Sequence, residues 1–175
     1  MLYILFCGIA VFTFGFDMLT KYLAVKTNVN VVVIPKLLKF RLSYNTGAAF
    51  SFLGEKEWAI TLFAVMAITI LSIVVAVMVY YIVKKKKPSI WVGVALALIF
   101  GGGLGNLVDR LSLKMVRDFI YAFYDTNIFP AIFNVADIAL VVGTIMVCIH
   151  LLFLDKNAVF SFKKEEKEDE KNVQN

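Results

Sequence analysis

Four long apolar stretches limit what this chain can fold into. They cover residues 2–23, 58–83, 88–108 and 128–154, and the second and third contain no charged residue. An α-helix rises about 1.5 Å per residue, so each stretch can cross a hydrocarbon core of about 30 Å. Hydrophobic residues make up 61% of the chain, which is more than soluble domains normally contain. The sequence therefore predicts four transmembrane helices.

The position of one lysine cluster predicts how these helices are oriented. Lys84–Lys87 and Pro88 form a short connection between the second and third stretches. Lysines clustered beside a transmembrane helix indicate the cytoplasmic side of the membrane. Alternation then places both termini in the cytoplasm and residues 24–57 and 109–127 outside. The outer segments also contain Lys and Arg residues, so this orientation depends on the charge density at one connection.

The first outer segment differs in composition from the helices around it. Residues 29–34 are rich in β-branched side chains, and residues 40–44 alternate between apolar and polar side chains. Both patterns are typical of strands, and Asn45-Thr46-Gly47 is a turn signal. We therefore expect a small β-sheet at the membrane surface.

These elements predict the domain organisation. Residues 1–155 are expected to form one four-helix membrane domain, whose outer β segment covers about residues 24–57. Residues 156–175 mix lysine with glutamate and contain little to bury, so they are expected to form a solvated cytoplasmic tail. The expected fold class is an all-α membrane protein with four transmembrane helices and a small extracytoplasmic β-sheet.

Polar side chains gather near the outer ends of three predicted helices and in the segment between the last two. A charge within a membrane is costly, so it usually indicates function or a paired structural role. The predicted orientation places all of these residues at a similar depth: Asp17, Lys21, Asn106, Asp109, Arg110, Asp118, Asn134 and Asp137.

Some of these residues could simply hold the helices together. Asp17 and Lys21 are four positions apart and can pair on one helix face. Asp109 and Arg110 could provide a similar polar contact within the bundle. Close helix packing is also expected through Gly101 and Gly105, because small residues let backbones approach in membranes.

The residue types near the outer face favour carboxylate chemistry. The only histidine, His150, is expected near the cytoplasmic end of the fourth helix. That position disfavours a Ser-His or Cys-His nucleophile and a zinc site, and we expect no metal or cofactor. Two close aspartates share a proton, so one can act as a base toward water and the other as an acid. Asp118 and Asp137 are candidates because neither has a basic partner at helical spacing.

Spacing alone does not select this pair, and other functions compete with hydrolysis. Asp17, Asp109 and Asp125 are expected at a similar depth. A small transporter or proton pathway would also use intramembrane aspartates, but its polar residues would extend through the full depth of the spans. An intramembrane aspartyl protease of the presenilin type would contain Gly-x-Gly-Asp, which this chain lacks. A purely structural membrane protein would leave Asp118 and Asp137 unexplained, and no soluble module is available to bind nucleic acid.

Five stretches, in order along the chain, resemble the lipoprotein signal peptidases, also called signal peptidase II. Each stretch is weak evidence by itself, but five in order with four spans are specific. Gly103 departs from the alanine that the family often has there. The matching stretches are Asp17-Met-Leu-Thr-Lys21, Asn45-Thr-Gly-Ala-Ala-Phe50, Gly101-Gly-Gly-Leu-Gly-Asn106 with Asp109-Arg110, Val116-Arg-Asp-Phe119 and Phe133-Asn-Val-Ala-Asp137.

The resemblance implies an aspartic endopeptidase of the bacterial cytoplasmic membrane with its active site at the extracytoplasmic face. Such an enzyme removes the signal peptide from prolipoproteins that carry diacylglyceryl on a cysteine, and it cuts just before that cysteine. The family's catalytic dyad corresponds to Asp118 and Asp137. Its other functional positions correspond to Asp17, Lys21, Asn45, Gly47, Gly102, Gly105, Asn106, Asp109, Arg110, Asn134 and Ala136.

These implications lead to more specific hypotheses about partners and roles. The expected partners are lipidated prolipoproteins and membrane lipids, with no nucleic acid, and the expected oligomeric state is a monomer. Asp17 and Lys21 are expected to brace the site between the first helix and the outer sheet. The side chains expected to hold the backbone carbonyls of the signal peptide are Asn45, Asn106, Arg110 and Asn134.

Overall fold

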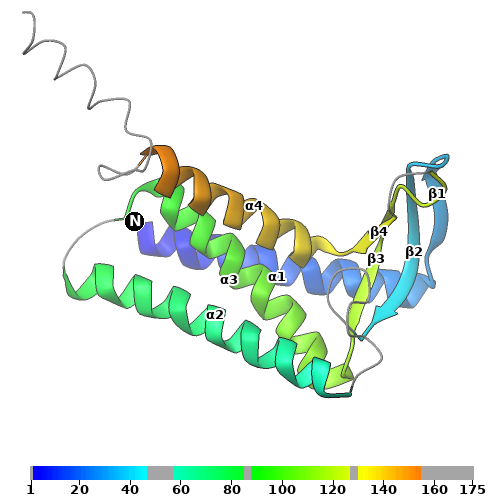
Figure 1. Ribbon diagram of the computed structural model, residues 1–175, viewed down its shortest axis with the longest axis horizontal. Helices are drawn as coiled ribbons and strands as arrows, with labels where there is room; N and C mark the ends of the chain where they lie inside the picture. Colours follow the sequence, from blue (N-terminus) through cyan, green and yellow to red (C-terminus); the bar gives the residue numbers. More distant parts are fainter. Residues whose placement is uncertain (1, 47–56, 85–87, 127–129, 155–175) are drawn as a thin grey trace, which may run out of the picture.

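A computed structural model describes residues 2–46, 57–84, 88–126 and 130–154. Four helices in these ranges are long and apolar enough to cross a membrane, as predicted (Figure 1). Gly47, Lys85–Lys87 and the tail at 156–175 lie outside the described residues, together with the predictions made for them. The helices are α1 (Leu2–Thr27), α2 (Glu57–Val83), α3 (Ile90–Leu113) and α4 (Val135–Ile149), and α4 continues into a π-helical segment, η2 (His150–Leu154).

Two helix boundaries differ from the predictions. α3 continues past Val108, where the predicted span ended, to Leu113, and Asp109 and Arg110 lie near the end of this helix, as expected. α4 begins at Val135 and not near residue 128, because residues 131–133 form a strand before it. Apolar composition alone does not distinguish a short buried strand from the start of a helix.

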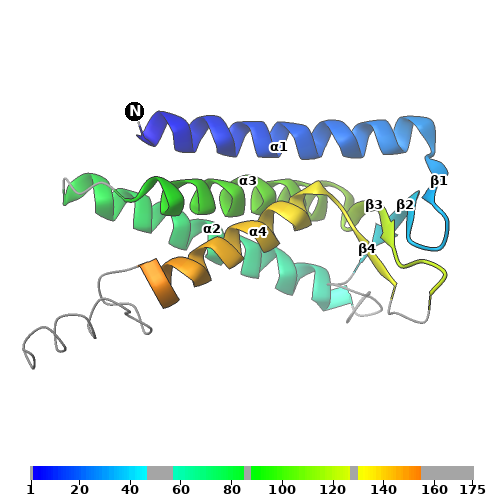
Figure 2. The same ribbon diagram turned by 90° about the horizontal axis from the view of Figure 1, so that it is seen from above.

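α3 lies in the middle of the bundle and packs against the other three helices (Figure 2). Glycines allow the close approach of its neighbours. A Cβ atom at Gly101 would lie 2.6 Å from the carbonyl oxygen of Ala10 in α1, and one at Gly102 would lie 2.6 Å from that of Ala136 in α4. Gly105 faces the carboxylate of Asp17. The expected close packing through Gly101 and Gly105 is therefore present.

Four antiparallel strands form one sheet in the order β1-β2-β3-β4. β1 (Asn30–Ile34) and β2 (Leu38–Asn45) confirm the predicted strands, whereas β3 (Val116–Ala122) and β4 (Ala131–Phe133) were not predicted. The sheet crosses one end of the bundle, which we call the sheet end (Figures 1 and 2). The pairing of β2 with β3 places Ser43 opposite Asp118 and therefore carries one candidate residue to this end.

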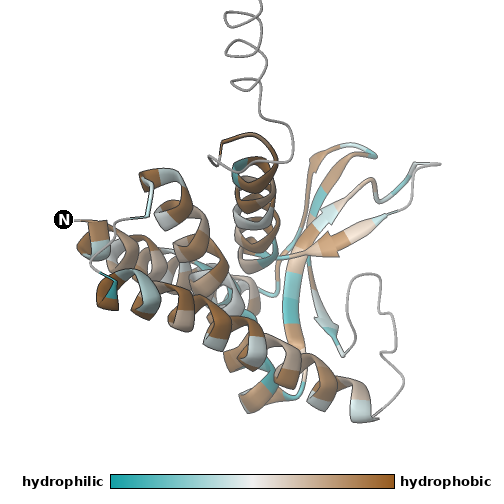
Figure 3. Cartoon of the chain, turned by 60° about the vertical axis from the view of Figure 1, so that its left-hand side comes forward, coloured by the Kyte–Doolittle hydropathy of each residue, from teal (hydrophilic) through white to brown (hydrophobic). Residues whose placement is uncertain are grey.

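Polarity is distributed in the opposite way to that of a soluble protein. Hydrophobic positions cover most of the helices, and hydrophilic positions gather where helices meet the sheet (Figure 3). The α4 residues Val141 and Ile145 are 57% and 53% exposed, as expected for side chains that face lipid. The largest fully buried side chains are instead polar or charged: Lys21, Asn134, Asp17, Asp109 and Asp118.

Candidate active site

Asp118 lies on β3 and is only 2% exposed. Both of its carboxylate oxygens accept hydrogen bonds from amide side chains. The Nδ2 of Asn134 donates to Oδ1 at 2.7 Å, and the Nδ2 of Asn45 donates to Oδ2 at 3.0 Å. Asn45 ends the neighbouring strand β2 and Asn134 precedes α4, so two other elements fix the orientation of this carboxyl group.

Asp137 occupies the first turn of α4, where it completes a reciprocal cap with Asn134. The side chain of Asn134 accepts a hydrogen bond from the backbone N–H of Asp137 at 3.0 Å. The Oδ2 of Asp137 in turn accepts from the backbone N–H of Asn134 at 3.1 Å. Its Oδ1 accepts from the Nδ2 of Asn106 at 2.8 Å. The local sequence Asn-Val-Ala-Asp is a helix start of the capping-box type, and this start orients Asp137.

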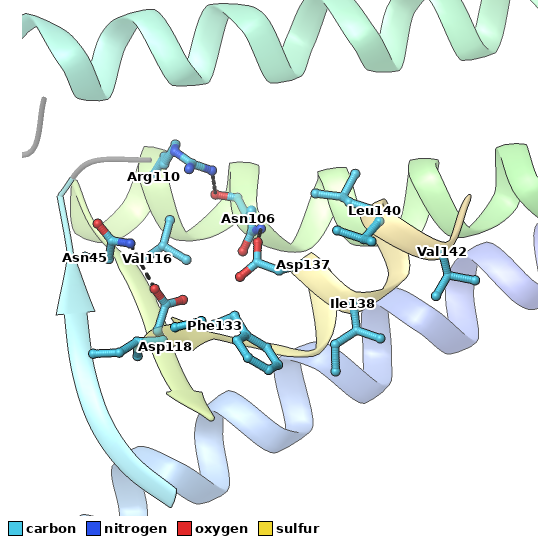
Figure 4. Close-up of a pocket in the computed structure, with 13 residues that line it drawn as sticks. Asn45, Asn106, Arg110, Val116, Asp118, Phe133, Asp137, Ile138, Leu140 and Val142 are labelled. Atoms are coloured by element: carbon cyan, nitrogen blue, oxygen red, sulfur yellow. Dashed lines mark hydrogen bonds between the residues drawn. The ribbon is translucent and has the colours of Figure 1, made fainter. Parts of the chain in front are cut away.

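The two aspartates face each other across a cavity of about 600 Å³ (Figure 4). Asn106 and Asn134 connect them behind the cavity, because the Nδ2 of Asn134 also donates to the Oδ1 of Asn106 at 3.1 Å. The polar end of the cavity is lined by both aspartates with Asn45, Asn106 and Arg110. Apolar residues of β4 and α4 line the rest, including Phe133, Ile138 and Val141. A substrate with both a peptide backbone and an apolar segment would match this lining.

The environment of Asp118 suits acid–base chemistry. Burial and then the nearby charge of Asp137 raise the pKa of Asp118 to about 7, while hydrogen bonds from Asn45 and Asn134 lower it. Two carboxyl groups that share a site can hold one proton between them. No three His, Cys, Asp or Glu side chains are grouped as metal ligands in the described part of the chain. The geometry therefore offers one carboxyl group that can give a proton and another that can receive one.

A buried charge network lies behind the two aspartates. The Nζ of Lys21 lies 2.8 Å from the Oδ2 of Asp17 and 3.3 Å from the Oδ2 of Asp109, and all three side chains are 0% exposed. Lys21 also donates to the Oδ1 of Asn106 at 3.0 Å. The Oδ1 of Asp17 accepts from the backbone N–H of Ala136 at 2.9 Å, at the start of α4. The predicted Asp17–Lys21 pair is therefore present, and it directly connects α1 with α3 and α4.

Comparison with known proteins identifies the family. A family profile described as "Signal peptidase (SPase) II" matches residues 9–153. The chain belongs to the signal peptidase II family. It is 45% identical over 122 residues to a lipoprotein signal peptidase of Pseudomonas paraeruginosa (strain DSM 24068 / PA7). The aligned residues cover 69% of this chain and 70% of that protein. It is 37% identical over 161 residues to the lipoprotein signal peptidase of Acinetobacter baylyi (strain ATCC 33305 / BD413 / ADP1), with 89% and 86% covered.

Solved structures agree with this family assignment. A bacterial membrane enzyme solved by the in meso method at 2.3 Å resolution superposes with a TM-score of 0.70 at 37% identity. The match covers 84% of this chain and 87% of that one. The predicted resemblance to signal peptidase II is therefore confirmed, and the transporter alternative receives no support from these relatives.

The structure corrects one sequence expectation about this signal peptidase II site and adds detail to two others. Asp109 does not pair with Arg110, whose guanidinium instead donates to the backbone oxygen of Asn106 at 3.3 Å and lies over the ring of Phe63. Asn134 is fully buried, and its side chain bonds to the carboxylate of Asp118 and to the backbone of Asp137, so its contact with a substrate carbonyl stays a prediction. The brace formed by Lys21 of α1 reaches β3 through Asp109, which pairs with Arg117, and Arg117 also lies 3.8 Å from the Sδ of Met18 in α1.

Arg117 is the residue that sequence reasoning missed. Its Nε lies 3.2 Å from both carboxylate oxygens of Asp109, and its backbone N–H donates to the Oδ2 of Asp109 at 3.1 Å. This clamp attaches β3 to α3 immediately beside Asp118. Helical spacing could not reveal it, because Arg117 lies beyond the end of α3 and reaches Asp109 only after the chain reverses into the sheet.

Replacing Arg117 is expected to weaken both stability and cleavage. Arg117→Gln removes one of the two cations that balance Asp17 and Asp109, and breaking a buried pair costs about 3 kcal/mol. Arg117→Lys keeps the charge but loses the planar fork, so its loss should be smaller. Thermal unfolding in detergent micelles measures the stability change. The exposed Lys114 provides the control, and equal unfolding of Arg117→Gln and Lys114→Gln would contradict the clamp.

Proposed function

We propose that Asp118 and Asp137 are the catalytic dyad with which this signal peptidase II removes signal peptides from prolipoproteins. The observation that carries this proposal is the approach of two carboxyl groups, from β3 and α4, to one cavity at the sheet end. Asn45, Asn106 and Asn134 hold the two groups in fixed orientations. Preorganised acid and base groups of this kind are what peptide hydrolysis by water requires.

The two aspartates take different roles in the proposed reaction. Asp137 accepts a proton from water as the water oxygen attacks the carbonyl carbon of the scissile peptide bond. Asp118 gives its proton to the carbonyl oxygen, because its raised pKa keeps it partly protonated near neutral pH. In the collapse of the tetrahedral intermediate the C–N bond breaks, one of the two hydroxyl groups returns its proton to Asp118, and the departing amine takes the proton that Asp137 accepted from water.

The placement of the dyad suits a substrate held at a membrane surface. The cavity continues from the aspartates along Ile138, Val141 and Val142 on the apolar face of α4. A diacylated cysteine would be anchored with its peptide at the headgroup level. We therefore place the sheet end outside the bacterial cytoplasmic membrane and both termini inside, with a monomer as the working unit. Lys84 then lies at the cytoplasmic ends of the helices, as the positive-inside rule requires.

The experiment that tests this function compares lipidated with unlipidated precursor. We expect the purified protein to release a product whose N-terminus is the lipidated cysteine, as mass spectrometry can show. The unlipidated precursor should react more than about tenfold more slowly, because binding energy from the lipid contributes to cleavage. Equal rates for the two precursors would refute lipid recognition while leaving the dyad intact.

The pH dependence of cleavage provides a further test of the Asp118 role. Burial raises the pKa of Asp118 from 3.8 to about 7, so the acid is available below this pH. Cleavage should therefore fall as pH rises through about 7. The same shift means that the folded protein holds a proton that the unfolded chain releases, so the free energy of unfolding should decrease between pH 3.8 and about 7. Asp118→Asn should flatten the plot of the free energy of unfolding against pH in this range. An unchanged slope would contradict the raised pKa of Asp118.

A further inference from the structure

The segment of residues 26–41, here called the basic hairpin, runs from the end of α1 through β1 into β2 and has a surface that the catalytic proposal does not explain. It contains four basic residues and no acidic one. All five residues of β1 are exposed, and β1 is an edge strand with β2 on one side only. Val31, Val32, Val33 and Ile34 are 46–54% exposed. An exposed apolar edge strand left in water favours aggregation, so we expect a partner to cover this one.

The depth of the basic hairpin points to the membrane surface. α1 contains 26 residues, which corresponds to about 39 Å of helix. The hydrocarbon core is only about 30 Å thick, so the last turns of α1 extend into the headgroup region. β1 begins at Asn30, shortly after α1 ends at Thr27. The sheet crosses the end of the bundle instead of continuing the helix axes, which keeps the hairpin near this level (Figures 1 and 2).

The charges of the basic hairpin fit an anionic partner at that depth. Lys26, Lys36 and Arg41 are exposed, and the Nζ of Lys39 lies 5.9 Å from the centre of the Tyr124 ring. Long basic side chains with apolar stems, placed beside tyrosine, are typical of membrane interfaces. Among the residues that the structure describes, the acidic residue packed nearby is the exposed Asp125, whose backbone N–H donates to the carbonyl oxygen of Lys36. One acid leaves the hairpin with an excess of positive charge.

We propose that the basic hairpin binds anionic phospholipid headgroups of the surrounding leaflet, with the apolar side chains of β1 inserted beneath them. The proposal rests on the proposed position of the sheet end at a membrane surface, but not on the dyad. Lipid binding there would hold β2 and β3 level with a substrate anchored in the same leaflet. Asn45 and Asp118 lie on those two strands, so the lipid surface would help to set the height of the site.

A spin label on β1 tests the proposal without using catalysis. Val32→Cys is labelled with a nitroxide in a Cys7→Ala, Cys148→Ala background, since both native cysteines are exposed. The protein is reconstituted into vesicles of phosphatidylcholine, alone or mixed with phosphatidylglycerol. Collisions with oxygen, which concentrates in the bilayer, should increase in the mixed vesicles, and collisions with a water-soluble nickel complex should decrease. High salt should reverse this difference, because screening weakens attraction between surface charges.

Charge removal identifies the residues responsible. The variant with Lys36→Gln, Lys39→Gln and Arg41→Gln should lose the response to phosphatidylglycerol. For each charge removed, the ratio of β1 inserted in the bilayer to β1 in water should fall about fivefold. Lys84→Gln is the control, because Lys84 follows α2 at the opposite end of the bundle and should leave the response unchanged (Figure 1).

Three results would overturn the lipid proposal. These are an equal response in both vesicle types, a full response in the triple variant, and spectral broadening that disappears when labelled protein is diluted with unlabelled protein. The last result would assign β1 to a second copy of the chain. Cleavage of lipidated precursor by the labelled parent reports separately on the proposed function, so failure of one proposal is distinguishable from failure of the other.

Discussion

Replacement of either dyad aspartate by asparagine is expected to lower the rate of signal peptide cleavage by about 10³-fold. Losses of this size are usual when a general acid or base is removed from an active site. Asparagine has nearly the shape of aspartate but cannot exchange a proton in the reaction. Asp137→Asn should keep the start of α4, because the amide oxygen can still accept from the backbone N–H of Asn134, while the donor on Asn106 loses its acceptor at a modest cost in stability. The protein should therefore fold and insert while the precursor stays uncut.

Asp118→Asn should also cost some stability, for a reason that is visible in the structure. Both oxygens of Asp118 accept from amide N–H donors, one from Asn45 and one from Asn134. Asparagine has a single acceptor oxygen, so one donor would face another donor. A buried polar group left without a partner costs about 1–3 kcal/mol, although removal of the buried charge offsets part of this. Thermal unfolding in detergent micelles separates this cost from the loss of cleavage.

Asp125→Asn is the matched control for the dyad variants. Asp125 was a competing candidate by depth, but in the structure it is exposed and does not line the cavity. Its variant should cleave lipidated precursor at the rate of the parent. The double variant of Asp118 and Asp137 should be no slower than the single variants, because residues that act as one unit are not additive. Normal processing by either single variant would remove that residue from the mechanism.

The comparison of these aspartates shows what the sequence alone could decide. Helical spacing correctly predicted the Asp17–Lys21 pair, because residues four apart share a helix face. Spacing left Asp17, Asp109 and Asp125 as rivals of Asp118 and Asp137, and the resemblance to a known family suggested which pair to prefer. The structure gives a physical reason for the preference, since the charges of Asp17 and Asp109 are balanced by their ion pairs with Lys21 and Arg117.

The predictions that failed depend on contacts between distant parts of the chain. The four helices were predictable because each apolar stretch satisfies its own backbone hydrogen bonds in lipid. β3 exists because β2 pairs with it, and the sequence from Val116 to Ala122 has no turn signal or regular alternation that announces a strand. The Asp109–Arg117 clamp follows from that same pairing. Local patterns therefore predicted the bundle, whereas the details of the site required the sheet.

Lys21→Met is expected to be the most destabilising single substitution in the network, at about 3–5 kcal/mol. Lys21 is fully buried between two carboxylates, and it also donates to Asn106, which holds Asp137. Methionine fills a similar volume but leaves both carboxylates without this cation. Asp109 keeps Arg117, whereas Asp17 keeps the backbone N–H of Ala136. The uncompensated charge on Asp17 should therefore account for most of the loss.

A second substitution tests that explanation. Adding Asp17→Asn to Lys21→Met removes the charge that has lost its partner, so the double variant should be more stable than Lys21→Met alone. The control is Lys26→Met, since Lys26 lies on the same helix but is exposed, and its change should stay within about 0.5 kcal/mol. Unfolding in detergent micelles measures all three variants. Further destabilisation of the Lys21→Met protein by Asp17→Asn would contradict the charge explanation, because removal of an unpaired charge should restore stability. Shape or packing at position 21 would then be responsible for the loss.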